Sequence, residues 1–98
     1  MSTVMVRYTV KPECAQENAE LVRAVYGELA RERPVGLRYA TFVMEDGVTF
    51  VHVAAHDGDN PLPGVTAFQE FTREIGQRCT VAPVVSQLQE VGSYRSSE

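Results

Sequence analysis

The segment VTFVHVAA, residues 48–55, is apolar at both of its alternating sets of positions. Successive side chains of a β-strand point to opposite faces of the sheet. One set here is Val48, Phe50 and Ala54, and the other is Val51, Val53 and Ala55. A strand that is apolar on both sides is typical of a sheet with both faces covered. We therefore expect residues 48–55 to form a central strand between two covering layers.

Three other segments have the two-residue period of strands. Residues 3–10 and 37–44 alternate in this way, and Asp46-Gly47, a pair typical of hairpin turns, connects the second of them to residues 48–55. Pro83 begins a last strand, VVSQLQEVGSY. The second and third strands are therefore expected to form a hairpin.

Helical periodicity fills the two remaining intervals. Pro12 suits a first helical turn, and apolar residues then recur at helical spacing to about Arg31. After the loop DGDNPLPG, Thr66 and Gln69 match a capping box, which predicts a second amphipathic helix that ends near Cys79. The element order is therefore βαββαβ.

This order within 98 residues predicts one domain, residues 1–98, of the α+β class. The expected fold is a ferredoxin-like sandwich, in which a four-stranded antiparallel sheet carries both helices on one face and has strands one and three in its middle. The helices cover only one face of the sheet. We expect a second copy of the chain to cover the other face across a twofold axis, which makes a homodimer.

Composition and charge argue against several classes of partner. The formal net charge is −4 and no Lys/Arg cluster offsets it, so we expect no nucleic acid to bind. An RNA-binding domain shares the element order, but Val48 and Val53 stand where base-stacking aromatics belong. No long apolar run predicts a signal peptide or a membrane span, and Cys14 and Cys79 have no CxxC spacing, so we expect reduced thiols and a cytoplasmic protein.

His52 and His56 are the only histidines of the chain. On a strand they share one face but lie about 13 Å apart, so no metal ion can bridge them and we predict no metal site. His52 is either a hydrogen-bonded core or interface residue, or a general base that faces a cavity. His56 follows at the strand end, where a solvated or loop-anchoring role is as plausible as a functional one.

Two polar residues interrupt the apolar faces of the helices. Asn18 points into the apolar stripe of the first helix, where its amide either bonds to neighbours in the core or lines a pocket. Arg78 lies toward the apolar edge of the second helix, where it either complements the helix dipole and reaches solvent or contributes to a site. Cys14 begins the first helix and is expected to be a buried thiol rather than a nucleophile.

The segments VKPE, RPVGLRYATFVMEDGVTFV and QEVGSY, together with the predicted strand order, resemble the antibiotic biosynthesis monooxygenase family of dimeric α/β barrels. The resemblance covers nearly the whole chain and implies oxygenation of aromatic substrates without a cofactor, quinol oxidation or, in one branch, haem degradation. The chain departs from the family at the end of strand three, where Ala54 and His56 replace a Glu-x-Trp pair. It has no tryptophan, which disfavours the haem-degrading branch.

These observations lead to two functional hypotheses. The first is a cofactor-independent monooxygenase for a small aromatic or quinol-like metabolite, with His52 as proton acceptor and Asn18 as the group that orients a substrate oxygen. The second is a non-catalytic dimeric module that binds a small apolar molecule. In both, the substrate-binding residues are expected to be Tyr8, Tyr39, Phe68, Phe71 and Arg78.

Overall fold

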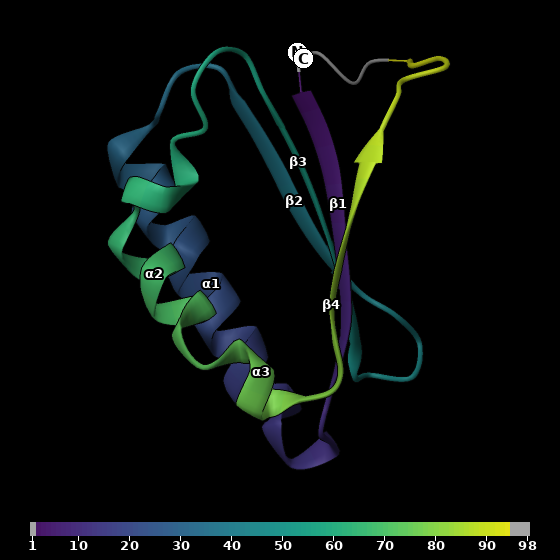
Figure 1. Ribbon diagram of the computed structural model, residues 1–98. Coiled ribbons are helices and arrows are strands. Elements are labelled where there is room, and N and C mark those ends of the chain that lie inside the picture. Colours follow the sequence, from purple (N-terminus) through teal and green to yellow (C-terminus); the bar gives the residue numbers. More distant parts are fainter. Residues whose placement is uncertain (1, 95–98) are drawn as a thin grey trace.

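A computed structural model describes residues 2–94 as a four-stranded antiparallel sheet with its helices on one face (Figure 1). The strands are β1 (Ser2–Val10), β2 (Leu37–Val43), β3 (Thr49–His56) and β4 (Cys79–Leu88), in the order β2-β3-β1-β4. The helices are α1 (Ala15–Glu32), α2 (Thr66–Arg73) and the short α3 (Ile75–Arg78), with 3-10 turns η1 (Pro12–Cys14) and η2 (Leu62–Gly64). The predicted ferredoxin-like order, with strands one and three in the middle, is confirmed.

The central strand β3 has two different faces. Phe50, His52 and Ala54 lie under the helices and are at most 6% exposed. Val51 and Val53 lie on the opposite face, where they are only half-buried. On this outer face the neighbouring strands leave Phe42, Val84 and Leu88 exposed, at 59, 59 and 39%. Within residues 2–94 the helices therefore cover the middle of one face of the sheet, and many apolar side chains of the other face stay exposed.

The turn between β2 and β3 is fixed by Asp46 and Gly47, as the sequence predicts. The Asp46 carboxylate accepts hydrogen bonds from the backbone N–H groups of Val48 and Thr49, both at 2.9 Å, and from the Thr49 hydroxyl at 2.6 Å. These bonds lower the pKa of Asp46, the Thr49 hydroxyl contributing most. Gly47 has a φ of 75°, which glycine adopts without a Cβ clash. The hairpin therefore aligns Thr41 with His52.

The predicted capping box at Thr66 and Gln69 is wrong. Helix α2 begins at Thr66 itself, and no side chain of its own segment caps it. Glu28 of α1 does so instead, because its carboxylate accepts hydrogen bonds from the backbone N–H groups of Thr66 at 3.1 Å and Ala67 at 2.8 Å. A negative group at this end also complements the helix dipole. The contact holds α2 against α1, which local spacing within residues 66–69 cannot indicate.

The predicted limits of the last two elements are also corrected. The second helix does not run unbroken to Cys79, because the backbone leaves helical geometry at Glu74 and resumes in α3. Strand β4 begins at Cys79, four residues before Pro83. Proline is tolerated inside β4 because this strand lies at the sheet edge and pairs only with β1. The break places Arg78 directly before the strand.

Candidate functional site

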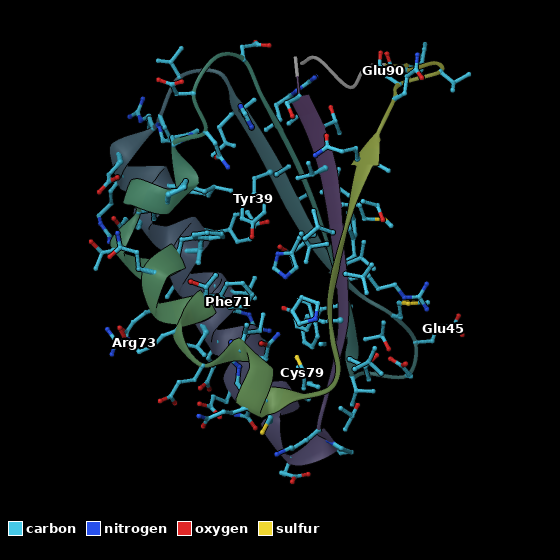
Figure 2. The ribbon with its side chains drawn as sticks, in the orientation of Figure 1. Tyr39, Glu45, Phe71, Arg73, Cys79 and Glu90 are labelled. Carbon is cyan, nitrogen blue, oxygen red and sulfur yellow. The ribbon has the colours of Figure 1, made fainter. Side chains whose placement is uncertain are left out.

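An apolar cavity of about 260 Å³ lies between α2 and the sheet. All four strands contribute to its wall, which explains why no single sequence segment predicts it. The lining residues are Val4, Val6 and Tyr8 of β1, Tyr39 of β2, His52 and Ala54 of β3, Pro83 of β4, and Asn60, Leu62, Phe68, Phe71, Thr72 and Ile75 from the loop and helices. Figure 2 shows the side chains of Tyr39 and Phe71 in the space between helices and sheet.

Tyr8, His52 and Tyr39 form a polar part of the cavity wall, and the chain of hydrogen bonds that joins them continues behind the wall to Thr41 and Tyr26. His52 lies at its centre, with Nε2 2.8 Å from the Tyr8 hydroxyl and Nδ1 2.7 Å from the Tyr39 hydroxyl. Thr41 Oγ1 lies 3.0 Å from the same Nδ1 and also bonds to the Tyr26 hydroxyl at 2.8 Å. Both ring nitrogens of His52 are therefore already engaged by protein groups.

Aromatic rings hold the imidazole in place. The His52 ring stacks with Tyr8 and with Tyr39, at centroid distances of 5.4 and 5.8 Å, and lies 5.2 Å from the Phe71 ring. The ring of Tyr26 stacks with that of Tyr39 at 5.2 Å. Such contacts add to the burial free energy of the rings. The imidazole therefore has little freedom to change its orientation.

Burial controls the protonation of this site. Desolvation lowers the pKa of His52 to about 4, so the imidazole is neutral at physiological pH. Desolvation also raises the pKa of Tyr8 and that of Tyr39 far above the usual range, so both phenols keep their protons. At neutral pH the wall consists of uncharged donors and acceptors.

Asn18 and Arg78 lie behind Tyr8 and do not line the cavity. Asn18 is fully buried, and its Nδ2 donates to the Tyr8 hydroxyl at 2.9 Å while its Oδ1 accepts from Arg78 Nε at 3.2 Å. Arg78 is 6% exposed, so the expectation that it reaches solvent is wrong. Its Nη2 donates at 2.6 Å to the carbonyl oxygen of Phe71, a group that the end of α2 leaves free.

The structure therefore separates the predicted site residues into two groups. Five lie on the cavity wall, namely His52, Tyr8, Tyr39, Phe68 and Phe71, and two lie in the layer behind, namely Asn18 and Arg78. Sequence reasoning missed Thr41 and Tyr26. Thr41 could have been predicted, because it lies two residues from Tyr39 on one strand and its side chain therefore points to the same face of the sheet. No sequence pattern identifies Tyr26, since it lies on α1 and its partner Thr41 lies on β2.

His56 is separate from this site. Its Nδ1 lies 2.9 Å from the carbonyl oxygen of Gly58, in the loop that follows β3. No group of three His, Cys, Asp or Glu side chains with metal-binding geometry occurs within residues 2–94. Within the same range, no helix is long and apolar enough to cross a membrane. Cys14 and Cys79 are free thiols, each partly buried.

The chain matches no protein-family model and no curated protein in sequence. It is similar to solved structures, including an antibiotic biosynthesis monooxygenase at 21% identity and a TM-score of 0.72, with 94% of this chain and 100% of that one covered. A protein of Nitrosomonas europaea assigned as such a monooxygenase has 14% identity, coverage of 92 and 89%, and a TM-score of 0.74.

SnoaB of Streptomyces nogalater, a cofactor-independent oxygenase, is similar over 97% of both chains at 13% identity and a TM-score of 0.68. At these identities the likeness concerns the fold and not the chemistry. The expected resemblance is confirmed at that level: the chain has the βαββαβ fold of the antibiotic biosynthesis monooxygenases.

Proposed function

We propose that this protein is a cofactor-independent monooxygenase that acts on a small aromatic phenol or quinol. The observation that carries the proposal is the apolar cavity of about 260 Å³ with the paired polar side chains of His52 and Tyr39 on one wall. Few polar groups in an apolar pocket are typical of a small-molecule site. The likeness in fold to SnoaB supports oxygenation rather than another reaction of the same cavity.

The cavity volume limits the size of the substrate. An engineered apolar cavity of about 150 Å³ binds one benzene ring. A volume of about 260 Å³ suits a fused two-ring system better than one of three or four rings. The rings of Phe68 and Phe71 offer flat apolar surface on the helix side. We therefore propose a bicyclic phenol of the naphthol type as the substrate class.

The reaction requires only the phenol and molecular oxygen. A phenolate donates electrons to O₂, one oxygen atom enters the ring as a new carbonyl, and the other leaves as water. For naphthol the balance is C₁₀H₈O + O₂ → C₁₀H₆O₂ + H₂O, with all four electrons supplied by the substrate. The task of the protein is to bind the ring system and to stabilise the phenolate oxygen.

Tyr39 is the group that we assign to this oxygen. His52, expected from the sequence as the proton acceptor, is a weak base at neutral pH because burial lowers its pKa to about 4. Asn18, expected to orient the substrate oxygen, lies behind Tyr8. Tyr39 lines the cavity and keeps its proton, so its hydroxyl can donate to a phenolate while His52 holds it in place.

The active form is proposed to be a homodimer. The outer face of the sheet carries apolar side chains that residues 2–94 leave uncovered, among them Phe42, Val84 and Leu88. A second copy packed on this face buries these side chains at an isologous interface. Sedimentation at micromolar concentration tests it, and a monomer would contradict it. The free thiols Cys14 and Cys79 suit a reducing compartment, and we place the protein in the cytoplasm.

The alternative, a non-catalytic binding module, rests on a specific observation. Both nitrogens of His52 are already bonded to Tyr8 and Tyr39, as in a site built for rigidity. Such a module would bind the bicyclic phenol and leave it unchanged.

Incubation with 1-naphthol under ¹⁸O₂ distinguishes the two functions. The monooxygenase produces a naphthoquinone with one ¹⁸O atom, at a rate above that of heated protein and lowered at least tenfold by Tyr39→Phe. Tyr26→Phe, which removes a hydroxyl outside the cavity wall, is the matched control and should retain most of the rate. Binding without turnover favours the module, and the absence of both refutes the proposed site.

A further inference from the structure

The buried guanidinium of Arg78 fixes the orientation of the Asn18 amide. A guanidinium only donates hydrogen bonds, so the Asn18 atom that faces its Nε at 3.2 Å must be the carbonyl oxygen. The Asn18 NH₂ group then faces the Tyr8 hydroxyl at 2.9 Å. An asparagine amide is often ambiguous in orientation, but a donor-only partner removes the ambiguity here.

The orientation of Asn18 determines where the Tyr8 proton lies. Tyr8 is 0% exposed, and its oxygen accepts from Asn18. Within residues 2–94, the one remaining hydrogen-bond partner of that hydroxyl is His52 Nε2, at 2.8 Å. If Nε2 carried a proton, the buried Tyr8 proton would have no acceptor, which is unfavourable. Tyr8 therefore donates to an unprotonated Nε2.

A neutral imidazole with Nε2 unprotonated carries its proton on Nδ1. This proton points to the Tyr39 hydroxyl at 2.7 Å, with Thr41 Oγ1 at 3.0 Å as a second acceptor. Tyr39 therefore accepts from His52. The Thr41 hydroxyl also acts on Tyr39, but its Oγ1 already lies within hydrogen-bond distance of His52 Nδ1 and of the Tyr26 hydroxyl, so the Tyr39 proton is left to face the cavity that this residue lines.

We propose that Arg78 is a positioning residue that, through Asn18 and Tyr8, holds His52 in the Nδ1–H tautomer and leaves Tyr39 as a hydrogen-bond donor toward the cavity. The site then selects apolar bicyclic molecules with a strong acceptor oxygen, a carbonyl or a phenolate, over the same ring system without one. This selectivity rests on the proposed function, because it requires the cavity to bind a ligand; the tautomer does not.

The tautomer is measured directly by long-range ¹H–¹⁵N spectra of the whole protein at pH 7. The chain has two histidines, so a His56→Gln variant assigns the signals of His52. The expected spectrum has a protonated Nδ1 and an unprotonated Nε2. A protonated Nε2 in the wild-type protein would overturn the inference, whatever the protein binds.

Asn18→Asp is expected to reverse the direction of the hydrogen bonds from residue 18 to Tyr39, because aspartate has nearly the same shape as asparagine. A carboxylate only accepts, so it takes the Arg78 bond as before and now also the Tyr8 proton. The Tyr8 oxygen must then accept from His52 Nε2–H, and Tyr39 must donate to Nδ1. The expected result is a switch of His52 to the Nε2–H tautomer. Retention of Nδ1–H in a folded variant contradicts the proposal. Gln16→Glu, the same change from an amide to a carboxylate on the exposed side of α1, should leave the tautomer as it is.

Ligand selectivity is tested with 1-tetralone and tetralin, which share a bicyclic skeleton and differ in one carbonyl oxygen. We expect Tyr39→Phe and Asn18→Asp to weaken 1-tetralone binding three- to tenfold, the range of one hydrogen bond, and to change tetralin binding less than twofold. Equal losses for both probes refute the selectivity. Failure of the wild-type protein to bind either probe refutes the proposed function, while the spectra still decide the tautomer.

Discussion

The stability of the protein should depend on pH through His52. Desolvation lowers the pKa of this residue to about 4 in the folded chain, against about 6.5 in an unfolded one. Between these values the unfolded state binds one proton more than the folded state. The free energy of unfolding therefore decreases as the pH falls through this window, and it is insensitive to His52 above pH 7.

The size of the effect follows from the two pKa values. A difference of one pKa unit corresponds to about 1.4 kcal/mol, so the full contribution of His52 is about 3 kcal/mol. Between pH 7 and pH 5 most of it is lost, which amounts to about 2 kcal/mol. A loss of that size is a substantial part of the stability of a small domain.

Urea unfolding at fixed protein concentration measures this dependence. His52→Gln changes stability at every pH by a constant amount but removes the titrating group, so its loss between pH 7 and pH 5 should be about 2 kcal/mol smaller than that of the wild type. His56→Gln is the control and should keep the wild-type dependence, since this ring is half-exposed and its Nδ1 bonds to the carbonyl oxygen of Gly58 in a surface loop. Equal losses for the wild type and His52→Gln would show that the reasoning about burial is wrong.

Two further predictions concern the frame around the site. Glu28→Ala should speed hydrogen exchange in the first turn of α2, because it removes the carboxylate that accepts hydrogen bonds from that turn. Glu20→Ala, on the exposed side of α1, is the control and should leave the exchange as it is. Unchanged exchange in Glu28→Ala would contradict the prediction. Gly36→Ala and Gly47→Ala should each destabilise the protein in urea by about 1–2 kcal/mol, because both residues have a positive φ, 80° and 75°. The two losses should be similar, since a Cβ at Gly36 meets the Asp57 carbonyl oxygen at 3.4 Å, an ordinary van der Waals distance, and a Cβ at Gly47 meets nothing within 4 Å; a markedly larger loss at Gly36 would contradict this.

The sequence predicts the fold because its patterns are local. The two-sided apolar pattern of residues 48–55 identifies the central strand, and Asp46-Gly47 identifies the turn that aligns β2 with β3. The predictions are wrong where the start of an element depends on a residue or strand that is distant in the sequence. The start of α2 depends on Glu28 from another helix, and β4 begins before Pro83 because the edge of the sheet tolerates proline.

The site could be predicted only in part for the same reason. Asn18 and Arg78 are each visible as polar residues on apolar helix faces, but nothing in their spacing shows that they bond to each other across 60 positions. His52 is visible as a polar residue in an apolar strand, whereas the tyrosines that engage both of its nitrogens come from two other strands. Sequence patterns identify polar residues at positions where an apolar one is expected, and the tertiary structure is needed to identify their hydrogen-bond partners.

The pairing of Asn18 with Arg78 gives the last prediction. No carboxylate within residues 2–94 forms an ion pair with Arg78, so a nearly buried charge is held by an amide and a carbonyl group. Removing one partner alone, by Asn18→Leu or Arg78→Met, should cost about 1–3 kcal/mol, because the other remains buried with a bond missing. Removing both should cost less than the sum by at least about 1 kcal/mol, since well-packed apolar residues often replace buried polar groups at no cost. Urea unfolding of the four proteins measures this coupling, and additive losses would mean that the two side chains do not depend on each other.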